Sequence, residues 1–187
     1  VVYGVHKGFA PPSAELYQKP ESSVNMELGT RVSAGNFKAE LIGFYNNYSN
    51  MLGSDLAASG GLGTLEQFNV GEARVKGVEF LMQYQPLPEA WKVRMPLQVS
   101  YTYTDTEMRN SFSSHSWGNV MKGDEIPYIF KHALNIQVGI EHKWFDANIG
   151  ARYNSDMRTS PGQGRIAERE KVPAHLVLDA SASGYVK

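Results

Sequence analysis

Apolar and polar residues alternate along much of the chain. Between Leu97 and Thr104, for example, Leu, Val, Tyr and Tyr alternate with Gln, Ser, Thr and Thr. Consecutive side chains of a β-strand point to opposite faces, so this period of two predicts a strand with one apolar and one polar face. The same alternation predicts further strands over Tyr3–Lys7, Asn25–Ala34, Phe37–Tyr48, Gly77–Tyr84, His132–His142, Phe145–Tyr153 and His175–Gly184. No helix of useful length is predicted.

The connections between these strands alternate in length. Short connections are expected at residues 35–36, 86–91 and 143–144, and long ones at residues 8–22, 51–67, 107–130 and 157–174. Successive strands should therefore run up and down, with tight turns at one end and long loops at the other. This arrangement is typical of an outer-membrane β-barrel.

Alternation by itself leaves a soluble barrel or sandwich open, because either kind of barrel has one apolar face. Two features favour the membrane. Aromatic residues gather near the predicted strand ends, as expected for the two membrane interfaces. The polar face also carries ionic residues within the strands, which a watery lumen would accept; they are Glu27, Arg31, Glu79, Glu141, Arg152 and Asp179.

Composition and motifs give no support for nucleic-acid binding or catalysis. The 187 residues include 18 Lys and Arg against 19 Asp and Glu, a net charge of −1, and no cysteine. The glycine-rich stretch Ser59–Thr64 lacks the Gly-Lys-Ser/Thr sequence of a phosphate-binding loop, and the five histidines show no metal-ligand spacing. The chain is therefore predicted to be no enzyme and to have no metal site and no cofactor of its own.

Cationic residues in or beside the long loops are the candidate binding site. A guanidinium group binds a carboxylate through two parallel hydrogen bonds, so a ring of arginines suits an anionic chelate rich in carboxylates. The predicted ligand-binding residues are Arg109, Arg152, Arg158, Gln163, Arg165 and Arg169, with Asn154 and His115 as further neutral donors. The alternative is that these arginines pair with nearby carboxylates or with anionic lipid.

Several stretches, in order along the chain, resemble the TonB-dependent outer-membrane receptors. Pro20–Gly29 (PESSVNMELG) is similar to the family's "PE-S-NYELG" strand, and Asn69–Glu79 (NVGEARVKGVE) to its "N-G-A-GVE" strand. Ser100–Thr106 (SYTYTDT) and Ile126–Asn135 (IPYIFKHALN) resemble the two strands that follow. The stretch Asp156–Gly164 is most similar to the ferric-dicitrate receptor branch.

The resemblance implies an all-β, antiparallel, up-and-down transmembrane β-barrel segment. About eight strands of a larger barrel of about 22 strands are expected. Residues 1–187 are then expected to be part of the barrel, without the plug domain and the final strands. The implied function is transport of ferric siderophores or ferric citrate-like chelates across the bacterial outer membrane, in a multi-pass protein. The implied partners are the ferric chelate, outer-membrane lipid and, through the absent plug, the TonB energy-coupling protein. Iron would enter only inside its chelate. A self-contained eight-stranded outer-membrane barrel (an adhesin or structural protein) and a soluble ligand-binding β-barrel are the alternatives.

Overall fold

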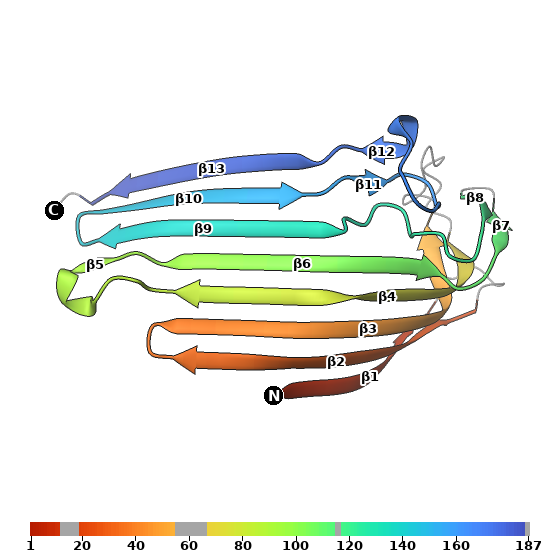
Figure 1. The fold of residues 1–187 in the computed structure, drawn as a ribbon, viewed down its shortest axis with the longest axis horizontal. Coiled ribbons are helices and arrows are strands. Elements are labelled where there is room, and N and C mark those ends of the chain that lie inside the picture. The colour runs from red at the N-terminus through yellow and green to blue at the C-terminus, as the bar shows by residue number, and fades with distance from the viewer. Residues whose placement is uncertain (12–18, 55–66, 115–116, 186–187) are drawn as a thin grey trace.

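The fold is a single large antiparallel sheet. The computed structural model describes residues 1–11, 19–54, 67–114 and 117–185. Eight long strands lie side by side in the order β1-β2-β3-β4-β6-β9-β10-β13, with the short strand β5 (Val93–Arg94) added beside β9 (Figure 1). Their bounds are β1 Val2–Ala10, β2 Glu21–Ala34, β3 Phe37–Ser54, β4 Gln67–Tyr84, β6 Leu97–Met108, β9 His132–His142, β10 Phe145–Asn154 and β13 His175–Gly184. The predicted meander of about eight strands is confirmed.

The strand register separates an apolar face from a polar one across the whole sheet. One row of directly paired residues, running from β2 to β13, is entirely apolar: Val32, Ala39, Met82, Val99, Ile136, Ala151 and Leu178. The adjacent row faces the other way and is mostly polar: Arg31, Glu40, Leu81, Ser100, Asn135, Arg152 and Val177. Large apolar side chains stay exposed on the apolar face, with Leu28 at 65% and Ile149 at 65%. Away from the long connections, the sheet therefore packs neither of its faces against another layer within the described residues.

The two ends of the sheet differ as expected. Tight turns join β2 to β3 and β9 to β10, whereas the described parts of the β6–β9 and β10–β13 connections lie side by side at the opposite end, the loop end (Figure 1). There the β6–β9 connection forms a small hairpin of β7 (Phe112–Ser114) and β8 (Gly118–Val120). The β10–β13 connection pairs β11 (Met157–Arg158) with β12 (Lys171–Val172). The first and last long strands, β1 and β13, do not pair with each other, so a closed eight-stranded barrel does not fit this sheet.

Helical structure is limited, in the described part of the chain, to two three-residue turns of 3-10 helix, η2 (Glu89–Trp91) and η3 (Glu168–Glu170). No helix among these residues is long and apolar enough to cross a membrane. Pro96 lies immediately before β6, where its carbonyl accepts a hydrogen bond from the Gly139 amide at 2.9 Å. The strand thus begins after the proline, as predicted.

Strands β3 and β4 are longer than their sequence patterns predict. The alternation predicts that β3 ends at Tyr48 and that a loop begins at Met51, but pairing continues to Ser54 against Gln67. The register shifts on both sides of the Met51–Gly71 pair, and Asn50 and Gly71 have positive φ angles of 52° and 87°. A bulge inserts an extra residue into one strand and breaks the alternation while pairing continues beyond it. The loop prediction for residues 51–54 was therefore wrong.

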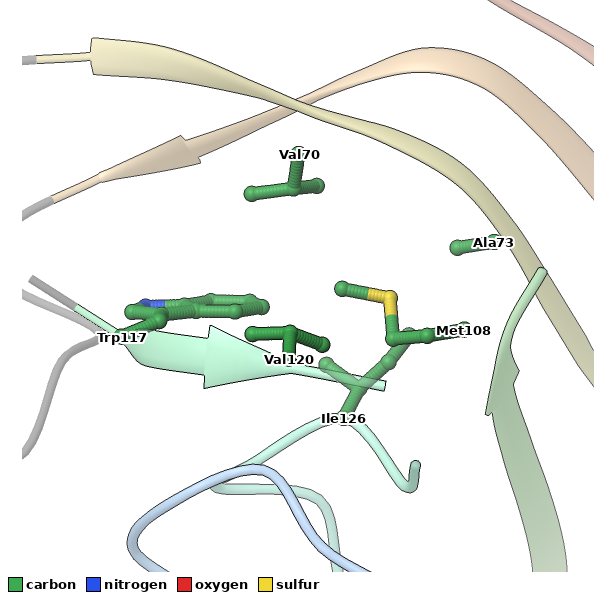
Figure 2. Packing of buried hydrophobic residues seen from close by; sticks show 6 residues of the cluster. All are labelled: Val70, Ala73, Met108, Trp117, Val120 and Ile126. Atoms are coloured by element: carbon green, nitrogen blue, oxygen red, sulfur yellow. The ribbon is translucent and has the colours of Figure 1, made fainter. Parts of the chain in front are cut away.

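The buried hydrophobic cluster of the described residues lies at the loop end. Figure 2 shows its side chains gathered between β4, the end of β6 and the β6–β9 connection. Its members are Val70, Ala73, Met108, Trp117, Val120 and Ile126, and Val70, Met108 and Val120 are almost completely buried. Ala73 and Met108 belong to the polar-facing set of β4 and β6, so the β6–β9 connection folds over the polar face of the sheet.

Candidate functional site

Two connections meet over the loop end of the polar face, and Glu125 joins them. Its carboxylate accepts a hydrogen bond from Nε of Arg158 at 2.8 Å and another from Nζ of Lys131 at 2.7 Å. Glu125 and Lys131 belong to the β6–β9 connection, whereas Arg158 belongs to the β10–β13 connection. The Arg158 side chain is only 5% exposed and also donates to the Gly164 carbonyl. The pair therefore bridges segments that are far apart in sequence.

Backbone and amide hydrogen bonds reinforce this bridge. The Glu125 amide donates to the Gly162 carbonyl at 2.9 Å, and the Tyr128 amide donates to the Arg158 carbonyl at 2.8 Å. The Gln163 side-chain amide donates to the carboxylate of Asp124 at 3.0 Å and to the Lys122 carbonyl at 3.2 Å. The two connections are thus held together by main chain and side chain alike.

The β6–β9 connection is also anchored to the strand below it. The Ile126 amide donates to the Thr106 hydroxyl at 2.9 Å, and the Met108 amide donates to the Asp124 carbonyl at 2.7 Å. Ile126 itself lies in the hydrophobic cluster. The segment around Glu125 is therefore fixed to the wall of the sheet as well as to the neighbouring connection.

A hollow of about 270 Å³ lies beside the Glu125–Arg158 pair. Its polar lining carries both signs of charge and hydroxyl groups, from Thr104, Thr106, Glu125, Lys131, Asp156, Arg158 and Arg165. Lys131 is half-exposed and Arg165 is exposed. Such a hollow offers hydrogen-bond donors to an anionic group that enters it.

The environment of Glu125 favours its charged form. Partial burial alone would raise the pKa of the carboxyl, but the hydrogen bonds and positive charges of Lys131 and Arg158 outweigh burial and lower the pKa below its ordinary 4.5. Glu125 is therefore an anion at neutral pH, and the bridge to Arg158 is ionic.

The six predicted ligand-binding residues lie in different surroundings. Arg109 pairs with Glu107 at 2.9 Å, and Glu107 also binds Arg74. Arg169 is 86% exposed and pairs with the adjacent Glu170 at 3.2 Å. Arg158 and Gln163 take part in the bridge described above. Arg152 projects from the polar-facing row of β10, and Arg165 lines the hollow; neither forms an ion pair with a residue that the structure describes.

Of the two neutral candidates, the structure describes Asn154. The Asn154 side chain hydrogen-bonds to Nε2 of His175 at 3.1 Å, so its amide is engaged at the end of β10. His115 and the stretch Ser59–Thr64 lie outside the described residues. No group of three or more His, Cys, Asp or Glu side chains within the described ranges is placed to hold a metal ion.

Sequence reasoning missed Glu125, Lys131 and Asp124. These residues were part of a predicted long loop, and nothing in their spacing shows that Glu125 reaches a residue 33 positions later. The available signal was indirect. Asp124 and Glu125 immediately precede the Ile126-Pro127-Tyr128 stretch that resembles the receptor family.

Comparison with known proteins identifies the family. The family model "TonB dependent receptor-like, beta-barrel" matches residues 2–187. No curated protein matches the chain. Among solved structures, the ferric yersiniabactin uptake receptor FyuA from Yersinia pestis superimposes with a TM-score of 0.67 at 18% identity, over 97% of this chain and 27% of that one. The copper transporter OprC gives a TM-score of 0.66 at 17% identity, over 99% of this chain and 29% of that one.

A further similar structure is the ferric citrate transporter FecA in its unliganded form. Its TM-score is 0.60 at 22% identity, over 87% of this chain and 23% of that one. The chain thus spans about a quarter of the length of these proteins. Identities this low show a shared fold, and the family match over nearly the whole chain adds the family itself. The chain belongs to the TonB-dependent receptors and forms part of their β-barrel.

Proposed function

We propose that this chain is the wall and part of the ligand-binding loop end of an outer-membrane receptor that takes up a ferric siderophore or a ferric citrate-like chelate. The apolar face of the sheet then contacts outer-membrane lipid and the polar face lines the lumen. The family match and the two-faced register support this arrangement, because a membrane barrel carries its apolar band outside and its polar residues inside. Uptake is proposed to be driven by the TonB energy-coupling protein acting on a plug domain.

The observation that carries the ligand class is the charge of the loop end. Arg152 and Arg165 offer guanidinium groups that no described carboxylate neutralises, on the polar face and at the hollow. Arg109 and Arg169 lie exposed nearby on their own connections, each beside a single carboxylate. A chelate that presents carboxylates or other acidic oxygens suits such a surface. The iron remains cargo inside its chelate and needs no protein ligand.

The test is equilibrium binding to the full-length receptor that contains these residues. Ferric citrate, ferric yersiniabactin and ferric enterobactin are titrated separately, and copper ion is included because one structural neighbour is named a copper transporter. We expect saturable binding of a ferric chelate. Replacing Arg165 or Arg152 by Ala should weaken it about 10- to 100-fold, the range for losing a hydrogen bond to a charged group.

The matched control is Arg94→Ala. Arg94 is also exposed, but it is ion-paired with Glu141 at 3.0 Å and lies at the short-turn end of the sheet. Its loss should leave chelate affinity unchanged. Saturable binding of copper ion without binding of any ferric chelate would contradict the proposal. So would unchanged affinity in both the Arg152→Ala and the Arg165→Ala receptors.

A further inference from the structure

Arg158 differs from the other loop-end arginines in being buried. Its guanidinium group is engaged on two sides, by the carboxylate of Glu125 on one connection and by the carbonyl of Gly164 on its own. Its own carbonyl accepts the Tyr128 amide, so its main chain is held as well. At 5% exposure it presents almost no surface to a ligand.

Because Arg158 is buried, the stability of its charged side chain depends on its partner Glu125. A guanidinium group taken out of water loses its hydration, and only a paired carboxylate and hydrogen-bonding oxygens compensate for that loss. Removing Glu125 would leave a buried, uncompensated charge. The β6–β9 and β10–β13 connections therefore separate only at a large cost, which the Glu125–Gly162 and Gln163–Asp124 contacts increase.

The second contact of Arg158 determines where Arg165 lies. Arg158 binds the carbonyl of Gly164, the residue immediately before Arg165. Gly164 has a φ of 65°, a left-handed conformation that glycine adopts readily, at a bend of the chain. Holding this carbonyl fixes the next peptide, from which Arg165 reaches the hollow.

We propose that the Glu125–Arg158 pair locks the two connections into one rigid body, and that Arg158 is a positioning residue that holds Arg165 at the hollow. The lock is a property of the receptor without ligand. Only the role of Arg165 rests on the proposed function. The two parts therefore have separate tests.

The lock is tested by the distance between spin labels in the ligand-free, full-length receptor. Labels are attached to Lys122→Cys in the β6–β9 connection and Ala167→Cys in the β10–β13 connection, both exposed positions. The chain contains no cysteine of its own that would take up label. We expect one narrow distance distribution in the parent. Arg158→Ala and Glu125→Gln should each broaden it, whereas Arg158→Lys, which keeps the charge, should broaden it less.

Arg94→Ala is the control for loss of one surface arginine, and it should leave the distribution narrow. Glu125→Gln keeps the shape of the side chain, so it tests the lock even where Arg158→Ala impairs folding. An unchanged narrow distribution in both Glu125→Gln and Arg158→Lys would overturn the lock.

The positioning role is tested with whichever of ferric citrate, ferric yersiniabactin or ferric enterobactin the parent receptor binds. Arg158→Ala should weaken binding about 10-fold, the effect of misplacing one charged hydrogen bond. In the receptor that already carries Arg165→Ala, the same change should have little further effect. Equal and additive losses would show that Arg158 acts independently of Arg165 and would overturn its positioning role. Absence of binding of all three ferric chelates in the parent would count against the proposed function, while the distance measurement would still decide the lock.

Discussion

The eight long strands, here called the strand wall, are stabilised in a different way from the loop end, which consists of the β6–β9 and β10–β13 connections and the strand ends beneath them. In the wall, the backbone ladder is continuous over eight strands, yet large apolar side chains such as Leu178, at 69% exposure, have no protein layer against them. At the loop end, Met108, Val70 and Val120 are almost completely buried in a small cluster, and charged residues are paired across two connections. The wall therefore depends on its surroundings for burial, whereas the loop end buries its own apolar surface as a water-exposed protein does.

This difference fits the two tasks of the proposed receptor. In the proposed membrane barrel, the apolar row of the wall contacts lipid, and its polar row faces water or a lumen occupant. The loop end must keep its shape where water surrounds it, so it needs a core and satisfied ionic groups of its own.

The largest effect is expected from opening the loop-end core. Met108→Ala should destabilise the β6–β9 connection by about 2–5 kcal/mol, because it leaves a cavity among fully buried neighbours. Hydrogen exchange measured on residues 117–131 of the full-length receptor should accelerate, including at Gly123, whose amide donates to the Met108 carbonyl at 2.8 Å. Met121, 59% exposed, supplies the control Met121→Ala. Equal exchange in the two variants would show that the cluster does not hold the connection.

A charge on the apolar face of the wall should have the next largest effect. Val138→Arg should destabilise the receptor in phospholipid vesicles by about 2–4 kcal/mol, the cost of an arginine near the middle of the bilayer. The adjacent Gln137 faces the other way, so Gln137→Arg should cost much less. Denaturant titrations of the two variants measure the difference. Equal costs would contradict the assignment of the two faces.

Acidification should loosen the lock between the connections. Because the pKa of Glu125 is lowered in the folded protein, the ionic bridge is present above the ordinary value of 4.5 and is lost as the pH falls through the lowered value. The charged groups around the carboxyl are Lys131 and Arg158, with Asp156 and Arg165 across the hollow. The spin-label distance distribution should therefore broaden in acid. In Glu125→Gln it should already be broad and should change little with pH; an equal response in both receptors would exclude Glu125 as the titrating group.

The smallest effect is expected at the short-turn end. Arg31→Ala removes an ion pair with Glu40 in which the arginine side chain is 61% exposed. Exposed pairs contribute about 0–1 kcal/mol. The denaturation midpoint of the full-length receptor in vesicles should hardly move. A loss as large as that of Val138→Arg would mean that the polar face of the wall is less solvated than its exposure indicates.

The wall was predictable because alternation records which face each residue takes. The bounds of β9, β10 and β13 follow from that signal almost unaided, whereas β6 continues to Met108, into residues that were predicted as a loop. The end of β3 was missed because the bulge at Met51 and Gly71 shifts the alternation while hydrogen bonding continues. The start of β4 was predicted at Gly77, although regular pairing with β3 already runs from Ala73 onward. The alternation of apolar and polar residues does not show that strand pairing resumes beyond the bulge.

The loop end was only partly predictable. Sequence shows that Arg158 and Arg165 lie in one long connection, but it does not show that the first is buried and the second exposed. That outcome depends on how the β6–β9 connection folds back over the polar face and brings Glu125 to Arg158. Such a contact between two loops has no periodic signature, so the ligand-binding role of each arginine stays a prediction.

The most direct test of the account is the affinity of the full-length receptor for anionic ferric chelates after removal of Arg152 and Arg165, the two arginines that form no ion pair with a described residue. The measurement compares the parent with the Arg152→Ala/Arg165→Ala receptor, using whichever of ferric citrate, ferric yersiniabactin or ferric enterobactin the parent binds. The account predicts a loss of at least about 100-fold, since two charged hydrogen-bonding groups are removed. An affinity equal to that of the parent would contradict it.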